Sequence, residues 1–288
     1  MAENLAKFGA AGNSESFAAV SKSSLDAPGW LDEVMGVDAY EYQCGNGVRI
    51  STETAKKLGD NAREHGILLS LHSPYYISLT NLANMDKNIG YVLQSCAAAK
   101  AMGADRIVIH SGSTTGRPRE EALADAKTTL LECIKAADAE GYGDIALCPE
   151  TMGKINQLGD FDEVMELCKL DERLLPCVDF GHLYARTKGE LEGCDAMAAL
   201  LDRMENAIGR ARTENFHSHF SQIEYSSGGE KRHLVFGNGS FGPDFRPLAR
   251  VIAERGLHPR FICESAGTQA EDAAAMKKMY MEELERVK

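Results

Sequence analysis

The 288-residue sequence has no run of about 18 apolar residues, which a membrane-spanning helix requires, so we expect no membrane span. Its first residues lack the basic and then apolar segments of a secretory signal, and no Pro- or Ser-rich linker divides the chain. None of its 8 cysteines belongs to a CxxC pair, and most lie in apolar stretches. These absences predict a single cytoplasmic domain over residues 1–288, with free and buried thiols.

The chain also has no excess of positive charge. Lys and Arg total 31, Asp and Glu total 43, and the formal net charge is −12. Such a charge disfavours nonspecific binding to nucleic acid. It remains compatible with a local basic groove, and with cations that neutralise clustered carboxylates.

Short apolar, β-branched stretches alternate with longer helix-like segments along the chain. The predicted strands are residues 6–12, 37–43, 67–73, 106–112, 144–151, 174–182, 215–221 and 259–265. The helix-like segments include residues 21–36, 73–103, 118–141 and 271–288, and Gly103, Gly141 and Gly256 are expected to end helices. Eight strand–helix units predict an α/β fold, a single (β/α)8 TIM barrel. An open doubly wound sheet is the main alternative, but the first strand is not followed by a good match to GxGxxG.

A few polar residue types recur where the predicted strands end. These residues are His72, His110, Glu150, Asp179, His182, His217, His219 and Glu264, and His233 follows the seventh strand. The C-terminal ends of barrel strands form one face, where functional groups gather. Carboxylates and histidines brought together there are unfavourable as unpaired charges unless cations bind between them. Imidazole with carboxylate suits Zn²⁺ or Mn²⁺, so the sequence predicts a metal site on this face.

In order and spacing, these residues resemble the endonuclease IV family of abasic-site DNA endonucleases, which are zinc-dependent (β/α)8 barrels. The similar segments are LHSPYYISL (71–79), IVIHSGS (107–113), PETMGKINQLG (149–159), CVDFGH (177–182), HSHFS (217–221), RH (232–233), GNG (237–239) and CES (263–265). The resemblance runs from about residue 6 to residue 266. It implies metal-dependent hydrolysis of DNA on the 5′ side of abasic sites.

The resemblance also implies two zinc ions that share Glu150, with Glu150 and Glu264 as the candidate catalytic residues. The first ion would be held by Glu150, His72 and His110, and the second by Glu150, Asp179, His217 and Glu264. A carboxylate shared by two cations suits two-metal phosphodiester hydrolysis.

A third zinc ion is held in the family by a histidine that corresponds to His182 and by an Asp-Arg-His triplet. This chain has Lys231, Arg232 and His233 at the triplet. A lysine ammonium does not ligate a cation, so Glu230 or His219 replaces the aspartate, or Lys231 stands in place of the third ion. His219 is otherwise expected to lie behind the ligands.

Three residues are candidates for substrate binding. Tyr75 and Tyr76 correspond to the position from which the family inserts side chains into the DNA stack, and Lys231 is the third candidate. With this function the partner is abasic-site DNA, and the sequence implies no membrane or protein partner.

The alternative function is that of a metal-dependent sugar or hydroxy-keto-acid isomerase or epimerase from the same group of barrels. Such enzymes resemble this chain in a Glu, Asp, His, Glu set on one metal, with the glutamates as acid–base groups. His72 and His110 would then bind hydroxyl groups of a small sugar-like substrate. A barrel that binds metal without catalysis is a third hypothesis.

Overall fold

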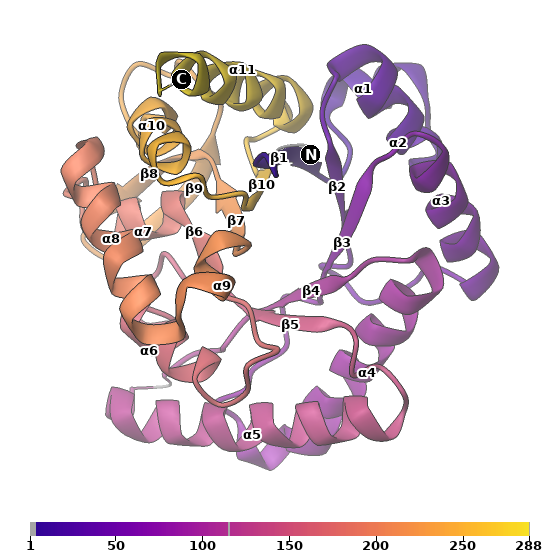
Figure 1. Cartoon of the computed structure of the whole chain (residues 1–288). Helices are drawn as coiled ribbons and strands as arrows, with labels where there is room; N and C mark the ends of the chain where they lie inside the picture. The colour runs from indigo at the N-terminus through magenta and orange to yellow at the C-terminus, as the bar shows by residue number, and fades with distance from the viewer. Residues whose placement is uncertain (1–3, 115, 288) are drawn as a thin grey trace.

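The computed structural model describes residues 4–114 and 116–287; the predicted domain also includes residues 1–3, 115 and 288, which lie outside this range. Parallel strands form one curved sheet surrounded by helices (Figure 1). The strands of this sheet are β1 (Lys7–Ala11), β2 (Ala39–Gln43), β3 (Leu68–His72), β4 (Arg106–Ile109), β5 (Ala146–Pro149), β6 (Cys177–Asp179), β7 (His217–Phe220) and β10 (Arg260–Cys263). Their order is β5-β4-β3-β2-β1-β10-β7-β6, and a parallel bridge between Glu150 and Cys177 links the two edges. The predicted TIM barrel is confirmed, with all eight predicted strands present.

Helices follow most strands and pack around the barrel. The α-helices are α1 (Glu15–Val20), α2 (Ala27–Trp30), α3 (Thr52–Glu64), α4 (Met85–Met102), α5 (Arg119–Ala139), α6 (Phe161–Cys168), α7 (Phe180–Arg186), α8 (Gly193–Ile208), α9 (Arg210–Glu214), α10 (Phe245–Arg255) and α11 (Gln269–Val287). Short 3-10 turns η1 (Ser24–Asp26) and η3 (Leu82–Asn84) and a π-helical turn η2 (Leu31–Met35) complete the set. Within residues 4–114 and 116–287, no helix combines the length and the apolar character that crossing a membrane requires.

Two helix predictions differ from the structure. Residues 21–36 divide into η1, α2 and η2, because Pro28 has no backbone N–H to continue a preceding helix and instead lies in the first turn of α2. Residues 73–81 form turns, since Pro74 disfavours a helical conformation at Ser73. Gly103 and Gly256 do end α4 and α10, with left-handed φ angles of 76° and 61°.

Aromatic rings form one part of the core between the barrel and its outer helices, which is otherwise mostly aliphatic. Phe8 of β1 stacks on Phe261 of β10 with ring centroids 5.5 Å apart, and Tyr280 of α11 lies 5.5 Å from Phe8. Phe245 of α10 packs edge-on against Phe261 at 5.2 Å. All eight cysteines are free, and all but Cys194 are buried, as predicted. This packing fixes the strands whose ends carry the polar residues.

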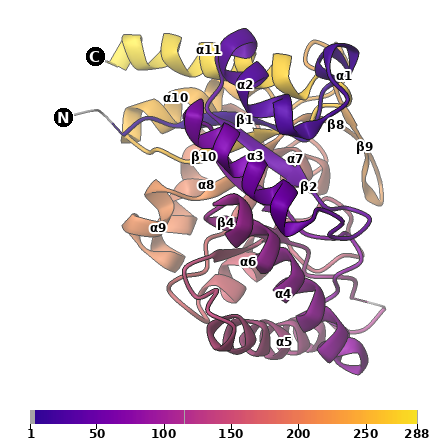
Figure 2. The same ribbon diagram turned by 90° about the vertical axis from the view of Figure 1, so that its right-hand side faces the viewer.

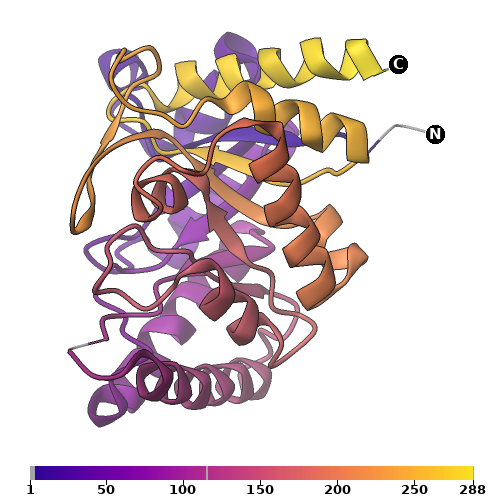
Figure 3. The same ribbon diagram turned by 90° about the vertical axis from the view of Figure 1, so that its left-hand side faces the viewer.

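A β-hairpin that the sequence reading did not predict follows β7. Its strands β8 (Gln222–Ser226) and β9 (Gly229–Leu234) pair antiparallel. In Figures 2 and 3 the hairpin projects from the end of the molecule opposite to the C-terminal end of α11. The signal for it was the Ser226-Ser227-Gly228-Gly229 turn between two polar strands, a sequence typical of hairpin turns.

Candidate metal centre

Side chains from the C-terminal ends of the strands line a cavity of about 570 Å³. The predicted site residues that line this cavity are His72, Tyr75, His110, Glu150, His182, His233 and Glu264. Asp179 and His217 are fully buried beside or beneath it. The volume lies in the range of roughly 300–1,000 Å³ that is usual for small-molecule sites.

The two oxygens of Glu150, which follows β5, face different histidines. Oε2 lies 3.0 Å from Nε2 of His110 and 3.5 Å from Nε2 of His72. Oε1 lies 3.0 Å from Nδ1 of His219 and 3.5 Å from Nδ1 of His182. The carboxylate therefore stands between two sets of imidazoles, as a group shared by two cations would.

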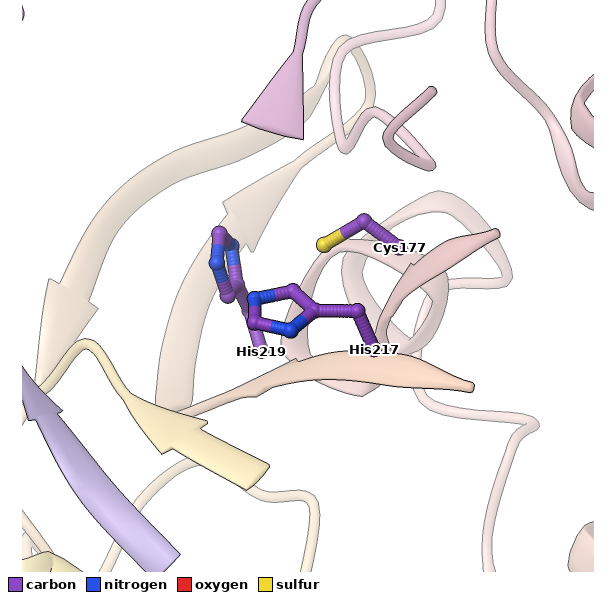
Figure 4. Close-up of side chains that lie close together, drawn as sticks. All are labelled: Cys177, His217 and His219. Carbon is purple, nitrogen blue, oxygen red and sulfur yellow. The ribbon is translucent and has the colours of Figure 1, made fainter. Parts of the chain in front are cut away.

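The structure places His219, rather than His217, in the second set of candidate ligands. Ligand atoms of Glu150, Asp179, His219 and Glu264 all lie within 4.8 Å of one another. Along β7, His219 is level with Asp179 of β6, whereas His217 is one step deeper and level with Cys177 (Figure 4). Both histidines face the barrel interior because alternate residues of a strand share a face, but only His219 reaches the C-terminal end.

Two oxygen atoms at the centre support the fit of this site to a metal. Glu150 Oε2 and Asp179 Oδ2 are buried and have no hydrogen-bond partner among the described residues. The nearby imidazole nitrogens approach them without hydrogen-bond geometry. Buried carboxylate oxygens without partners are unfavourable, and a cation between them and the imidazoles removes that penalty. Imidazole nitrogens with carboxylate oxygens are a donor set for Zn²⁺ or Mn²⁺.

The carboxylates at the centre respond differently to burial and to their neighbours. Burial alone would raise the pKa of Glu150, but His219 and His110 outweigh it and hold the pKa well below its ordinary value. Burial raises the pKa of Glu264, and Glu150 and Asp179 add to the rise. Burial would lower the pKa of His182, but Asp179 and Glu230 raise it to about 9. Three carboxylates, Glu150, Asp179 and Glu264, meet at this centre, an arrangement that suits a divalent cation.

A third group of candidate ligands consists of His182, Glu230 and His233. Glu230 Oε2 lies 3.5 Å from Nε2 of His182, and the rings of His182 and His233 are 5.4 Å apart. A register shift in the hairpin pairs Tyr225 with Glu230 and Glu224 with Arg232, so Lys231 is the extra residue of a β-bulge. Glu230 and His233, three residues apart, lie on the same side because of this bulge. Of the alternatives for the third group, the structure places Glu230 there.

Lys231 lies on the outer side of the hairpin, away from the predicted substrate position. It pairs with Glu224, which also accepts a bond from Arg232 Nε at 2.7 Å. The lysine that does line the cavity is Lys154, in the loop after β5. Arg186 of α7 holds this loop by donating to the carbonyl oxygens of Lys154 at 2.9 Å and Met152 at 3.2 Å.

The two tyrosines after β3 have different surroundings. Tyr75 is 55% exposed, lines the cavity, and stacks near His110 with ring centroids 5.6 Å apart. Tyr76 is 50% exposed and packs edge-on against Tyr91 of α4 at 4.7 Å. Only Tyr75 is therefore in contact with the candidate centre.

The sequence reading also missed Glu41, which lies in β2 and has no exposed surface. Its carboxylate contacts Nε2 of His217 and Nε2 of His219, each at 2.9 Å. No neighbouring residue marks it in the sequence, since these contacts span 176 and 178 residues. The one available signal was a carboxylate among the aromatic residues of a predicted strand.

Together these features define a (β/α)8 barrel that carries groups of histidines and carboxylates able to hold metal at the C-terminal ends of its strands. The family model for the Xylose isomerase-like TIM barrel matches residues 33–286, and the chain belongs to that family.

The chain is similar in sequence to an uncharacterized protein and to probable endonuclease 4 proteins. An uncharacterized protein of Methanocaldococcus jannaschii is 30% identical over 250 residues, which cover 86% of this chain and 89% of that protein. A probable endonuclease 4 of Streptomyces avermitilis is 28% identical over 221 residues, 73% of this chain and 69% of the relative.

Two solved structures share the fold. Endonuclease IV from Thermus thermophilus superposes with a TM-score of 0.65 at 18% identity, covering 97% of this chain and 99% of that one. A D-tagatose 3-epimerase-like protein superposes with a TM-score of 0.68 at 20% identity, covering 98% of both chains. Proteins with this fold therefore include an endonuclease and an epimerase-like protein, and the fold by itself does not distinguish between these functions.

Proposed function

We propose that this chain is a metal-dependent phosphodiester hydrolase that cleaves DNA on the 5′ side of abasic sites. The observation that carries the proposal is the Glu150 carboxylate, whose two oxygens face separate sets of imidazoles. Similarity to probable endonuclease 4 proteins supports it. The eight free thiols favour the reducing cytoplasm as its compartment.

The described side chains would hold two or three zinc ions, or manganese in their place. The groups are His72, His110 and Glu150; Glu150, Asp179, His219 and Glu264; and His182, Glu230 and His233. Bound there, the cations would act as Lewis acids on the scissile phosphodiester group and neutralise the charge that develops on it.

Residues around the centre have roles that follow from their positions. Tyr75 presents a half-exposed ring beside His110, on which an extruded sugar can pack. Extruding a nucleotide is easier where no base pair must be broken. Lys154 is the single Lys or Arg among the cavity-lining residues, so it is the group that would contact a substrate phosphate.

Incision of a duplex with one abasic site tests this function directly. We expect the purified protein to cleave it in the presence of Zn²⁺ or Mn²⁺, and Glu150→Gln to lose cleavage. Glu53→Gln is the matched control, because Glu53 is exposed on α3 and pairs only with Lys57 among the described residues. A metal-loaded protein that leaves the duplex intact would contradict the proposal.

The second candidate is a sugar or hydroxy-keto-acid isomerase or epimerase. The observation that favours it is a cavity of about 570 Å³ that carries carboxylates and only one lysine, which suits a small neutral substrate. Glu150 and Glu264 would then exchange a proton with the substrate carbon beside the carbonyl, and His72 and His110 would bind its hydroxyl groups. Solvent deuterium entering a sugar or keto acid at that carbon, without cleavage of abasic DNA, would select this function.

A further inference from the structure

The Glu41 carboxylate is completely surrounded by donors beneath the candidate metal centre. Oε1 lies 2.9 Å from His219 Nε2 and accepts from Gln43 Nε2 at 3.2 Å. Oε2 lies 2.9 Å from His217 Nε2 and accepts from Ser70 Oγ at 2.9 Å. The partners come from three different strands, so the carboxylate ties β2, β3 and β7 together inside the barrel.

These contacts determine where the histidine protons lie. Both Glu41 oxygens accept from other side chains, Gln43 Nε2 and Ser70 Oγ, as the oxygens of a carboxylate do, so the Nε2 atoms of His217 and His219 are placed to donate to it. A metal-bound imidazole carries one proton, and in His219 the contact with Glu41 keeps that proton on Nε2.

The other nitrogen of His219 is left to face the metal centre. Nδ1 lies 3.0 Å from Glu150 Oε1 and 3.5 Å from Glu264 Oε1. Nδ1 makes a hydrogen-bond contact with Glu150 Oε1 that needs a second ring proton, and a cation between the same atoms would take the place of that proton. The geometry at Nδ1 thus suits a metal ligand, while the geometry at Nε2 suits a hydrogen-bond donor.

His217 and Cys177 complete the layer beneath the centre. In Figure 4 the sulfur of Cys177 points toward the two imidazole rings of β7, and the three side chains lie close enough to hold a cation themselves. Glu41 already occupies Nε2 of both histidines, and a cation in this layer would have to compete with those two hydrogen bonds.

We propose that Glu41 is a positioning residue, which fixes the tautomer and ring orientation of His219 so that Nδ1 is its metal-binding nitrogen. Carboxylates that accept the second N–H of a ligating histidine orient the ring and increase its basicity. The proposal rests on the proposed metal centre but not on which reaction the centre performs. His217 supports the same carboxylate from a position one step deeper in the barrel.

Histidine side-chain spectra of the wild-type protein provide the first test. Long-range ¹H–¹⁵N correlation of the zinc-loaded protein should show His219 protonated at Nε2 and coordinated through Nδ1, with the signals assigned by their loss in His219→Gln. Coordination through Nε2 would overturn the proposal, and would instead indicate a cation held with Cys177 and His217. This measurement needs no variant of Glu41 that folds.

Metal affinity provides the second test. We expect Glu41→Gln to bind zinc about 10- to 100-fold more weakly at the ion that His219 holds, measured by competition with a chelator. Ser70→Ala is the matched control, because it removes a donor to Glu41 while leaving the contact with His219, and it should keep wild-type affinity. If folded Glu41→Gln bound zinc with wild-type affinity, the role of Glu41 would be contradicted and the proposed function would stand. If the wild-type protein bound no zinc, the proposed function would be contradicted as well.

Discussion

His219 Nδ1 lies 3.0 Å from Glu150 Oε1, although β6 separates the strands β5 and β7 in the sheet. This contact predicts different outcomes for the two histidines of β7. His219→Ala should lose affinity for one zinc ion by more than the roughly 10- to 100-fold typical of an outer partner, since it removes a ligand. His217→Ala should retain that ion. Zinc content after dialysis measures the difference, and equal losses in both variants would contradict the assignment.

Two adjacent residues of β9 should behave differently. Glu230 contacts His182 within the third group of ligands, while Lys231 pairs with Glu224 on the outer side of the hairpin. Glu230→Gln should therefore lower the zinc content of the protein, and Lys231→Ala should leave it unchanged. The opposite result would mean that Lys231, rather than Glu230, faces the centre in solution.

Lys154 predicts how the protein responds to a charged substrate. If it contacts a phosphate, Lys154→Ala should weaken DNA binding by a similar factor for all sequences and lower the slope of log K against log salt by about 1. Lys57→Ala, on the outer face of α3, should leave the slope unchanged. An unaltered slope in Lys154→Ala would favour a neutral substrate such as a sugar.

Asp105 should contribute to stability at the opposite face of the barrel. It accepts two bonds from Arg260 at 2.8 and 3.0 Å and two from Arg106 at 3.2 and 3.1 Å, and both arginines are buried. Asp105→Asn leaves two buried guanidinium groups without a counter-charge. Because the Asp105 side chain is itself 52% exposed, solvent screens part of this interaction, and we expect the substitution to lower the free energy of unfolding by about 1 to 2 kcal/mol at neutral pH, as measured by urea denaturation.

The same carboxylate predicts the direction of a pH effect. Burial would raise the pKa of Asp105, but Arg260 and Arg106 outweigh it and hold the pKa well below its ordinary value. A group whose pKa is lower in the folded state stabilises the fold above the unfolded pKa. The stabilisation is therefore present above about pH 5 and is lost as the pH falls toward the lowered pKa. The difference in free energy of unfolding between the wild type and Asp105→Asn should become smaller as the pH is lowered. A difference that stayed constant with pH would contradict this role of Asp105.

The barrel could be predicted because its strands and helices have different apolar periods, and because polar residues recur at the strand ends. The choice between His217 and His219 could not be predicted in the same way. Both residues face inward on one strand, and their heights depend on the register with Cys177 and Asp179 of the neighbouring strand. A match by sequence position alone does not distinguish which histidine of such a pair is the metal ligand.

Glu41 and the hairpin were missed for different physical reasons. Glu41 acts through contacts with residues far along the chain, so its local sequence resembles any strand with a single acidic residue. The hairpin has a turn signal, but its strands are polar and lie outside the barrel, where apolar alternation is weak. Lys154 likewise belongs to a loop whose path is set by Arg186 rather than by a local pattern.

The bulge at Lys231 has a consequence for recognising distant relatives of this chain. Compared with the endonuclease IV pattern, which has an aspartate at the place of Lys231, this chain has a carboxylate one position earlier, at Glu230, and its side chain approaches His182. Glutamate is one methylene longer than aspartate, which extends its reach from the shifted backbone position. Sequence patterns with fixed spacing would score such a chain as having lost a ligand, whereas superposed side-chain positions would score it as having kept one.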